Sequence, residues 1–179
     1  SRWLAEEVKR SPLTQRFPVS VIPYGLDLND FAPRDSVACR ETLGLPGDAK
    51  ILLFVADGLD NERKGFALLT KVLENLPSDL PVAVVSVGRN QPQVEVNVPW
   101  FHVGQVNNDR QLSELYSAAD LFVIPSLQDN LPNTVLEAMA CGTPTLGFDI
   151  GGIPDMVRPG ITGMLVPPAD APALGAAMF

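Results

Sequence analysis

Short apolar runs alternate with amphipathic stretches along almost the whole chain. The run from Ile51 to Ala56 is apolar at every position, which is typical of a strand buried on both faces of a sheet. Between Asp109 and Ala119, apolar residues recur at helical spacing. The predicted strands cover residues 19–22, 50–56, 82–87, 101–103, 121–124, 144–148 and 164–166. The predicted helices cover residues 1–8, 35–43, 65–74, 108–119 and 132–140, a short stretch ending at 157, and 170–179.

This alternation predicts the fold class. Strands that alternate with amphipathic helices form a parallel sheet with helices on both faces. We therefore expect a doubly wound, Rossmann-like α/β fold whose ligand lies at the carboxyl ends of the strands. Residues 1–179 suit a single domain. The first predicted helix has no preceding strand and the last has no closing cap, so we interpret both ends as truncated.

Composition narrows the class of protein. Of the 179 residues, 46% are hydrophobic and 19% are charged, as in globular proteins. The net charge of −8 argues against a nucleic-acid-binding surface. No apolar run approaches the roughly 18 residues of a membrane span, and the acidic amino end is unlike a signal peptide. Cys39 and Cys141 lack metal-ligand spacing, so we expect reduced, buried thiols in a cytoplasmic protein.

The most informative stretch runs from Asp129 to Glu137, between a predicted strand and the first turns of a helix. A helix that begins at Pro132 or Asn133 has free N–H groups and a positive dipole end, which attract phosphate. The two carboxylates can accept hydrogen bonds from sugar hydroxyls. The stretch therefore suits a polyhydroxylated phosphate ester. The alternative is that Asp129 caps a loop and Glu137 is solvated.

The helical spacing also predicts which way Glu137 points. The apolar side of this helix comprises Val135, Leu136, Met139 and Ala140, so we expect Glu137 to point away from the core.

Three further features each have a structural and a functional interpretation. Gly151 and Gly152 form either a tight turn or a contact to a sugar. Asp155 suits a local cap. His102 is the single histidine, lies in a predicted strand and is interpreted as structural, and Tyr116 is interpreted as core.

Several blocks of sequence follow one another along nearly the whole chain: residues 21–27 (VIPYGLD), 63–65 (RKG), 115–126 (LYSAADLFVIPS), 136–144 (LEAMACGTP) and 151–157 (GGIPDMV), with Phe31, Gly160, Gly163, residues 165–167 and Asp170. Through these blocks the chain resembles the carboxyl-terminal domain of a GT-B glycosyltransferase from the large retaining family that uses nucleotide sugars (group 1, family 4 type).

The resemblance implies a role for each candidate residue. The family has two glutamates eight apart, at the positions of Asp129 and Glu137, and Asp129 departs from this pattern because its side chain is one methylene shorter. Asp129 would face the donor sugar, and Glu137 would accept from the ribose hydroxyls. The intervening loop would hold the sugar and diphosphate through backbone amides. Its donor-binding residues are Asn130, Leu131, Asn133 and Thr134. Pro132, where a glycine is usual, has no N–H to contribute.

The resemblance further implies a clamp for the diphosphate leaving group that needs no metal or other cofactor. Lys64 matches the lysine of this clamp and is, with Asp129, the predicted catalytic pair. The position of the clamp arginine reads Gly58, and Arg63 is the candidate substitute.

The implied partners are a nucleotide sugar and an amino-terminal acceptor domain of the same protein. Residues 1–179 alone would then bind donor without transferring sugar. The full-length enzyme would serve glycan or glycolipid synthesis, with peripheral membrane association left open and no transmembrane segment. Two alternatives remain at this point: a sugar-nucleotide epimerase of the same architecture, and a nucleotide-sugar-binding module without catalysis. The base, the sugar and the acceptor are undetermined.

Overall fold

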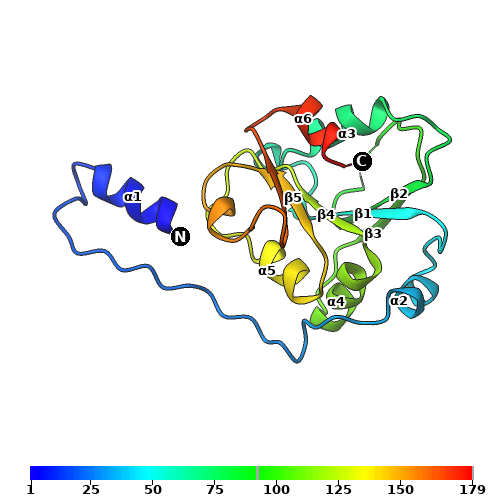
Figure 1. The fold of residues 1–179 in the computed structure, drawn as a ribbon, viewed down its shortest axis with the longest axis horizontal. Helices are drawn as coiled ribbons and strands as arrows, with labels where there is room; N and C mark the ends of the chain where they lie inside the picture. Colours follow the sequence, from blue (N-terminus) through cyan, green and yellow to red (C-terminus); the bar gives the residue numbers. More distant parts are fainter. Residues whose placement is uncertain (92, 179) are drawn as a thin grey trace.

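A computed structural model describes residues 1–91 and 93–178 and contains a six-stranded, wholly parallel sheet. The strand order is β3-β2-β1-β4-β5-β6 (Figure 1). The strands are β1 (Lys50–Gly58), β2 (Val82–Arg89), β3 (Trp100–Gly104), β4 (Leu121–Ile124), β5 (Thr145–Phe148) and β6 (Gly163–Val166). This order is that of a doubly wound fold, so the predicted fold class is confirmed.

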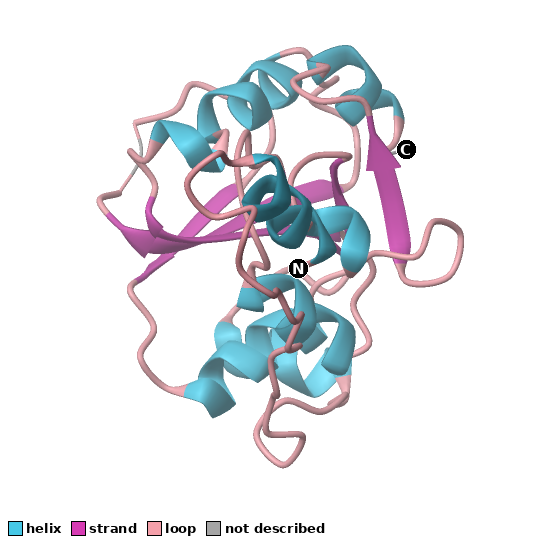
Figure 2. Cartoon of the chain, turned by 90° about the vertical axis from the view of Figure 1, so that its left-hand side faces the viewer, coloured by secondary structure: helices cyan, strands magenta, loops and turns pink. Residues whose placement is uncertain are grey.

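Helices cover both faces of the sheet, as Figure 2 shows. One layer comprises α2 (Ser36–Leu43), α4 (Asp109–Ala118) and α5 (Asn133–Ala140); the other comprises α3 (Phe66–Glu74) and α6 (Ala171–Ala176). Alternate side chains of β1 supply the two cores, because successive residues of a strand point to opposite faces. Ile51 and Leu53 pack with the first layer, and Leu52 and Phe54 with the second.

The strand order also fixes where a ligand can approach. The chain winds outward from β1 to β3, then returns to place β4 on the other side of β1. Neighbouring loops therefore leave the carboxyl ends of β1 and β4 in opposite directions, which is where doubly wound folds place their ligand crevice.

Helix α1 (Arg2–Arg10) stands apart from the sheet and is joined to α2 by a long extended segment (Figure 1). The predicted strand at 19–22 is wrong. Its β-branched residues favour extended backbone, but a strand also requires a neighbour for its backbone hydrogen bonds. Within the described residues, this segment joins neither edge strand, β3 or β6. Seven large apolar side chains between α1 and α2 are exposed: Leu13, Phe17, Val19, Val21, Ile22, Tyr24 and Leu28.

Most predicted boundaries agree with the structure because their caps are encoded locally. Asp35, Asn108 and Asp170 cap α2, α4 and α6 through side-chain oxygens, and Gly44 ends α2 in the left-handed region. The short helix predicted to end at 157 is a 3-10 turn, η2 (Ile153–Asp155). The last predicted helix extended to Phe179, which lies outside the described residues.

Among the described residues, none of the helices has the length and apolar character needed to cross a bilayer.

A close backbone contact joins the loop after β1 to the loop after β4. The first loop contains the 3-10 turn η1 (Glu62–Lys64), and Gly65 links that turn to α3 with a φ of 69°. A Cβ atom on Gly65 would lie 1.7 Å from the carbonyl oxygen of Pro125. Only glycine permits both this φ and this approach.

Replacing Gly65 by alanine should therefore lower the free energy of unfolding by about 3 kcal/mol or more, because strain in the left-handed region adds to a backbone collision. Gly44→Ala is the matched control, since Gly44 has a φ of 65° and open space around its Cβ position. That control should lose only about 1–2 kcal/mol. Urea unfolding measures both losses, and equal values would contradict the close contact.

Candidate functional site

Three loops meet at the carboxyl edge of the sheet. The amide of Leu127, after β4, donates a 2.7 Å hydrogen bond to the carbonyl of Arg63, after β1. The amide of Gly152, after β5, donates to the carbonyl of Asp129 at 3.0 Å. These bonds bring together segments that are far apart in the sequence, at the crevice that the strand order creates.

Gly151 and Gly152 are required by close packing. Gly151 has a φ of 58°, and its Cβ position lies 2.0 Å from the carbonyl oxygen of Asp129. The Cβ position of Gly152 lies 1.5 Å from the carbonyl oxygen of Asn130. The tight-turn interpretation is confirmed, because any larger residue would displace the loop that holds Asp129. A contact between these glycines and a sugar remains a prediction.

Lys64 and Asp129 form an ion pair within this cluster of loops. Lys64 Nζ lies 2.7 Å from Asp129 Oδ2, and the two side chains are 26% and 16% exposed. The second oxygen, Asp129 Oδ1, accepts from the amide of Asn130 at 3.0 Å. The structure thus brings the two predicted catalytic residues into direct contact, with each carboxylate oxygen of Asp129 engaged.

Helix α5 begins at Asn133, as predicted. Pro132 is its N-cap residue with a φ of −67°, and no side chain within the described part of the chain caps the helix end. The first N–H groups of a helix generally lack a partner inside the helix, and they lie at the positive end of the helix dipole. Asn133 is exposed and Thr134 is half-buried, so the first turn of α5 is not covered by other parts of the chain.

The expectation that Glu137 points away from the core holds only in part, because Glu137 is half-buried and one of its oxygens meets a core side chain. The buried positions of α5 are Val135 and Ala138, whereas Leu136 and Met139 are only half-buried. Glu137 accepts a 2.8 Å hydrogen bond at Oε2 from the hydroxyl of Tyr116, which is fully buried on α4. The apolar pattern of α5 alone could not reveal this, because α4 packs beside the helix and supplies the polar partner.

Burial changes the electrostatics of this pair. It raises the pKa of the Glu137 carboxyl, while the hydrogen bond from Tyr116 lowers it in part and the nearby charge of Asp109 raises it further. Burial, with the adjacent Glu137, also holds the pKa of Tyr116 well above its usual range. Tyr116 therefore stays protonated and acts as the donor. The charged form of Glu137 is disfavoured by its partial burial.

Gly58 occupies the position of the clamp arginine, so Arg63 is the candidate for a second cation beside Lys64. Arg63 is exposed, and its backbone is held by Asn61 and Leu127. Gly58 lies opposite Arg89 in the register of β1 and β2, and the Arg89 guanidinium pairs with Asp57. Arg63 can thus turn toward a ligand without breaking an ion pair among the described residues.

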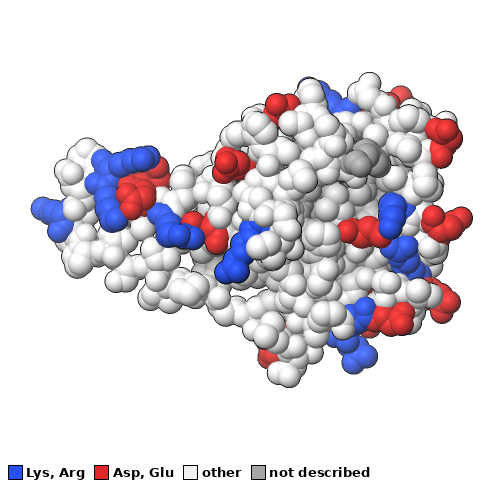
Figure 3. Space-filling model, viewed as in Figure 1, with Lys and Arg blue, Asp and Glu red and all other residues white. Residues whose placement is uncertain are grey.

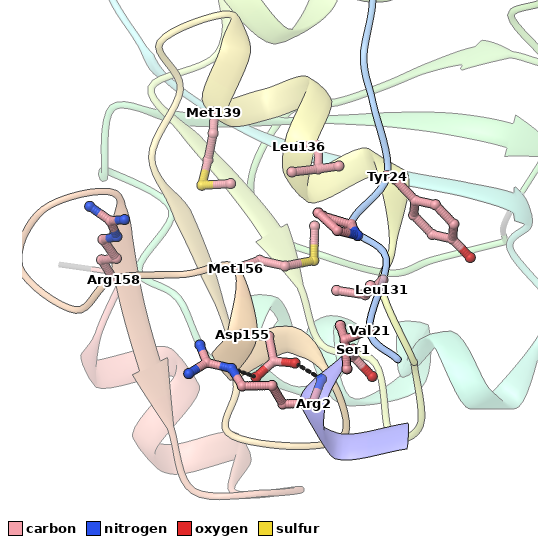
Figure 4. A pocket seen from close by; sticks show the side chains of 11 residues that line it. Ser1, Arg2, Val21, Tyr24, Leu131, Leu136, Met139, Asp155, Met156 and Arg158 are labelled. Carbon is pink, nitrogen blue, oxygen red and sulfur yellow. Dashed lines mark hydrogen bonds and ion pairs between the residues drawn. The ribbon is translucent and has the colours of Figure 1, made fainter. Parts of the chain in front are cut away.

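Beside the loop lies an apolar hollow of about 330 Å³, whose walls include Leu131, Leu136 and Met156 (Figure 4). The first residues of α1 close one side of it. Ser1 Oγ hydrogen-bonds the side-chain oxygen of Asn130. Asp155 is not a local cap, because it pairs with the Arg2 guanidinium at 3.2 Å and accepts from the Arg2 amide.

The remaining candidates have structural roles. His102 Nδ1 lies 3.0 Å from Ser86 Oγ, which satisfies the imidazole as expected. Cys39 and Cys141 are buried free thiols. Across the described residues, no group of three or more His, Cys, Asp or Glu side chains is placed to hold a metal ion. Charges of both signs are interspersed over the face in Figure 3.

The burial of Glu137 predicts that Glu137→Gln stabilises the folded chain at pH 8, because glutamine keeps the acceptor for Tyr116 without the charge. A carboxyl group whose pKa is raised by folding stabilises the folded state most when the pH is below its pKa in the unfolded chain, which is about 4.3. That contribution is lost as pH rises through the folded value. The gain from Glu137→Gln should therefore shrink as pH falls to 4. Urea unfolding at both pH values measures it.

Asp120→Asn is the control with the opposite sign. Burial alone would raise the pKa of Asp120, but hydrogen bonds from the Ile51 amide, Lys50 and Arg40 outweigh it and lower that pKa. Asp120→Asn should lose on the order of 1–3 kcal/mol at pH 8. A loss of stability in Glu137→Gln at pH 8 would show that the charge of Glu137 supports the fold.

Comparison with known proteins agrees with this geometry. The sequence profile of the family described as "Glycosyl transferases group 1" matches residues 49–179. A D-inositol 3-phosphate glycosyltransferase of Thermobispora bispora is 33% identical over 165 residues, which is 83% of this chain and 38% of the relative. The chain thus spans about two fifths of the length of the curated relatives it matches.

Solved structures give the same result. The sucrose-phosphate synthase of Thermosynechococcus elongatus superposes with a TM-score of 0.84 and 31% identity, covering 99% of this chain and 46% of that one. Anabaena HepE, solved in complex with UDP-glucose, has a TM-score of 0.74 and 21% identity, covering 88% and 46%. The site at the β1–β4 crevice, the matched profile and these relatives lead to one conclusion: the chain belongs to the group 1 glycosyltransferases and has the Rossmann-like fold of a GT-B half.

Proposed function

We propose that this chain is the donor-binding half of a retaining glycosyltransferase, which moves a sugar from a nucleoside diphosphate to an acceptor. One observation carries the proposal: Lys64, Asp129 and the uncapped start of α5 converge at the crevice between β1 and β4. This arrangement combines a cation, a carboxylate and helix amides. It matches the parts of a nucleotide sugar, which are a diphosphate and two polyhydroxylated rings.

Each residue has a defined role in the proposal. Lys64 and the first amides of α5 bind the diphosphate, with Arg63 as a further cation. Glu137 lies one turn into α5, about 6 Å from Asn133 along the axis, and accepts from the ribose hydroxyls. Asp129 faces the sugar and holds Lys64 in place through their ion pair. Asn130, Leu131, Asn133 and Thr134 line the loop between the two carboxylates.

The proposed chemistry is stabilisation of the leaving group. As the bond from the sugar anomeric carbon to the diphosphate breaks, negative charge develops on the diphosphate oxygen. Lys64 is paired with Asp129 before the donor binds, so the cation is already fixed near that charge. Fixed charges and amides lower the barrier because they need no reorganisation during the reaction. No divalent metal takes part in this scheme.

The binding site for the acceptor would lie in the remainder of the full-length protein. The chain covers 38% of the T. bispora relative and 46% of the sucrose-phosphate synthase, so a second domain would complete the cleft. Transfer requires both reactants to be held in register, and the isolated chain would bind donor only. UDP is the probe of choice, since Anabaena HepE was solved with UDP and with UDP-glucose.

The first prediction from this scheme is that the chain binds UDP equally well with and without a divalent metal. The charge of the diphosphate would be met by Lys64 and the α5 amides, which need no bridging ion. Isothermal calorimetry of UDP binding in EDTA and in excess Mg²⁺ measures this. Binding that disappears in EDTA would reject the metal-free clamp while leaving nucleotide binding itself intact.

The second prediction concerns Lys64→Ala. Loss of a charge-assisted bond should weaken UDP binding about tenfold or more. Uridine, which lacks phosphates, should bind as it does to the unaltered chain. Lys71→Ala is the matched control, because Lys71 is exposed on α3 and faces the groove with α6. Equal losses for UDP and uridine in Lys64→Ala would indicate a distorted loop rather than a lost phosphate contact.

A further inference from the structure

We propose that Tyr116 is a positioning residue that aims the Glu137 carboxylate at the bound nucleotide. This inference rests on the proposed function, in which Glu137 accepts from the ribose hydroxyls. Its starting point is the 2.8 Å hydrogen bond from Tyr116 Oη to Glu137 Oε2. Tyr116 would not touch the ligand itself, because its side chain is fully buried behind α5.

Tyr116 is held rigidly enough to fix another side chain. Its ring packs edge-on against Phe122 of β4, with ring centroids 5.6 Å apart and an angle of 86°. Its backbone carbonyl accepts a 2.6 Å hydrogen bond from Thr143 Oγ1. Helix α4, the strand β4 and the turn before β5 therefore all constrain this tyrosine, and its hydroxyl has a fixed position in the core.

A fixed donor matters because a glutamate side chain has several rotamers and its carboxylate has two equivalent oxygens. Tyr116 occupies Oε2, and among residues 1–91 and 93–178 it is the one group that donates to this carboxylate. Oε1 remains available to a ligand. Restricting the carboxylate before binding reduces the entropy lost when the nucleotide arrives.

The surroundings of Glu137 make this hydrogen bond a determinant of its ionisation. The groups that act on the carboxylate are Tyr116 and Asp109 of α4, and the thiol of Cys141 lies at the end of α5. Burial and Asp109 raise the pKa of Glu137, and the Tyr116 hydroxyl lowers it. A ribose hydroxyl donates best to the ionised form, so Tyr116 keeps Glu137 competent toward lower pH.

Tyr116→Phe tests the inference, because it removes only the hydroxyl. UDP binding, measured by calorimetry on the 179-residue chain, should weaken about tenfold. The fall of UDP affinity on the acid side of its pH profile (the acid limb) should also move to higher pH, because without the Tyr116 donor Glu137 takes up a proton at higher pH. We therefore expect UDP affinity to be lost at a higher pH in Tyr116→Phe than in the unaltered chain.

Ser86→Ala is the matched control, since it removes a buried hydroxyl of β2 that contacts His102 and Trp100 and neither Tyr116 nor Glu137. It should lower the free energy of unfolding but leave UDP affinity and its pH midpoint unchanged. Unchanged affinity and midpoint in Tyr116→Phe, or the same loss in Ser86→Ala, would overturn the positioning role.

A second substitution keeps the test decisive if Tyr116→Phe does not fold. Incorporating 3-fluorotyrosine at position 116, with Tyr24→Phe to leave one tyrosine, retains the ring and makes the hydroxyl a stronger donor. The acid limb should then move to lower pH, and an unmoved limb would overturn the inference.

Failure of the proposed function would look different. If the unaltered chain does not bind UDP, or if Glu137→Ala binds UDP normally, the proposed ribose contact is excluded. The positioning role of Tyr116 is then excluded as well. Weak binding by Glu137→Ala beside normal binding by Tyr116→Phe would reject the positioning role alone.

Discussion

The contact between the loop after β1 and the loop after β4 governs the rest of the site. It consists of the approach of Gly65 to the Pro125 carbonyl and the hydrogen bond between Leu127 and Arg63. These are backbone contacts, so they fix the chain positions of Lys64 and Asp129 before either side chain is considered. The 2.7 Å ion pair then follows from the fold. A parallel sheet supplies the place, because β1 and β4 are neighbours whose connections run in opposite directions.

The charge distribution of the chain explains why this fixed geometry is needed. With a net charge of −8, the molecule as a whole repels an anionic donor. Attraction must come from local groups, and the half-buried Lys64 and the start of α5 act at short range where solvent screens less. Glu137 differs from Lys64, because partial burial raises the pKa of its carboxyl group and so disfavours its charged form. Such unfavourable groups are concentrated at functional sites, where binding rather than stability maintains them.

The sequence pattern predicted the six strands, the helices and most of their caps, because apolar runs, helical periodicity and capping residues are each encoded within a few residues. Asp35 and Gly44, for example, mark the two ends of α2 by local hydrogen bonding and local backbone conformation. It failed at residues 19–22, because strand formation depends on a distant partner. It also missed the contact of Tyr116 with Glu137. A helical pattern separates apolar from polar positions on one helix, but α4 and α5 are separated in the chain and meet only in the folded core.

Binding of nucleotide sugars where the loops after β1 and β4 meet is tested most directly by the amide NMR shifts of the ¹⁵N-labelled chain during a UDP titration. We expect the largest changes on the amides of Gly65, Asn133 and Thr134, which border the proposed diphosphate position. Changes concentrated instead in the groove between α3 and α6, around Lys71 and Gly175, would contradict it.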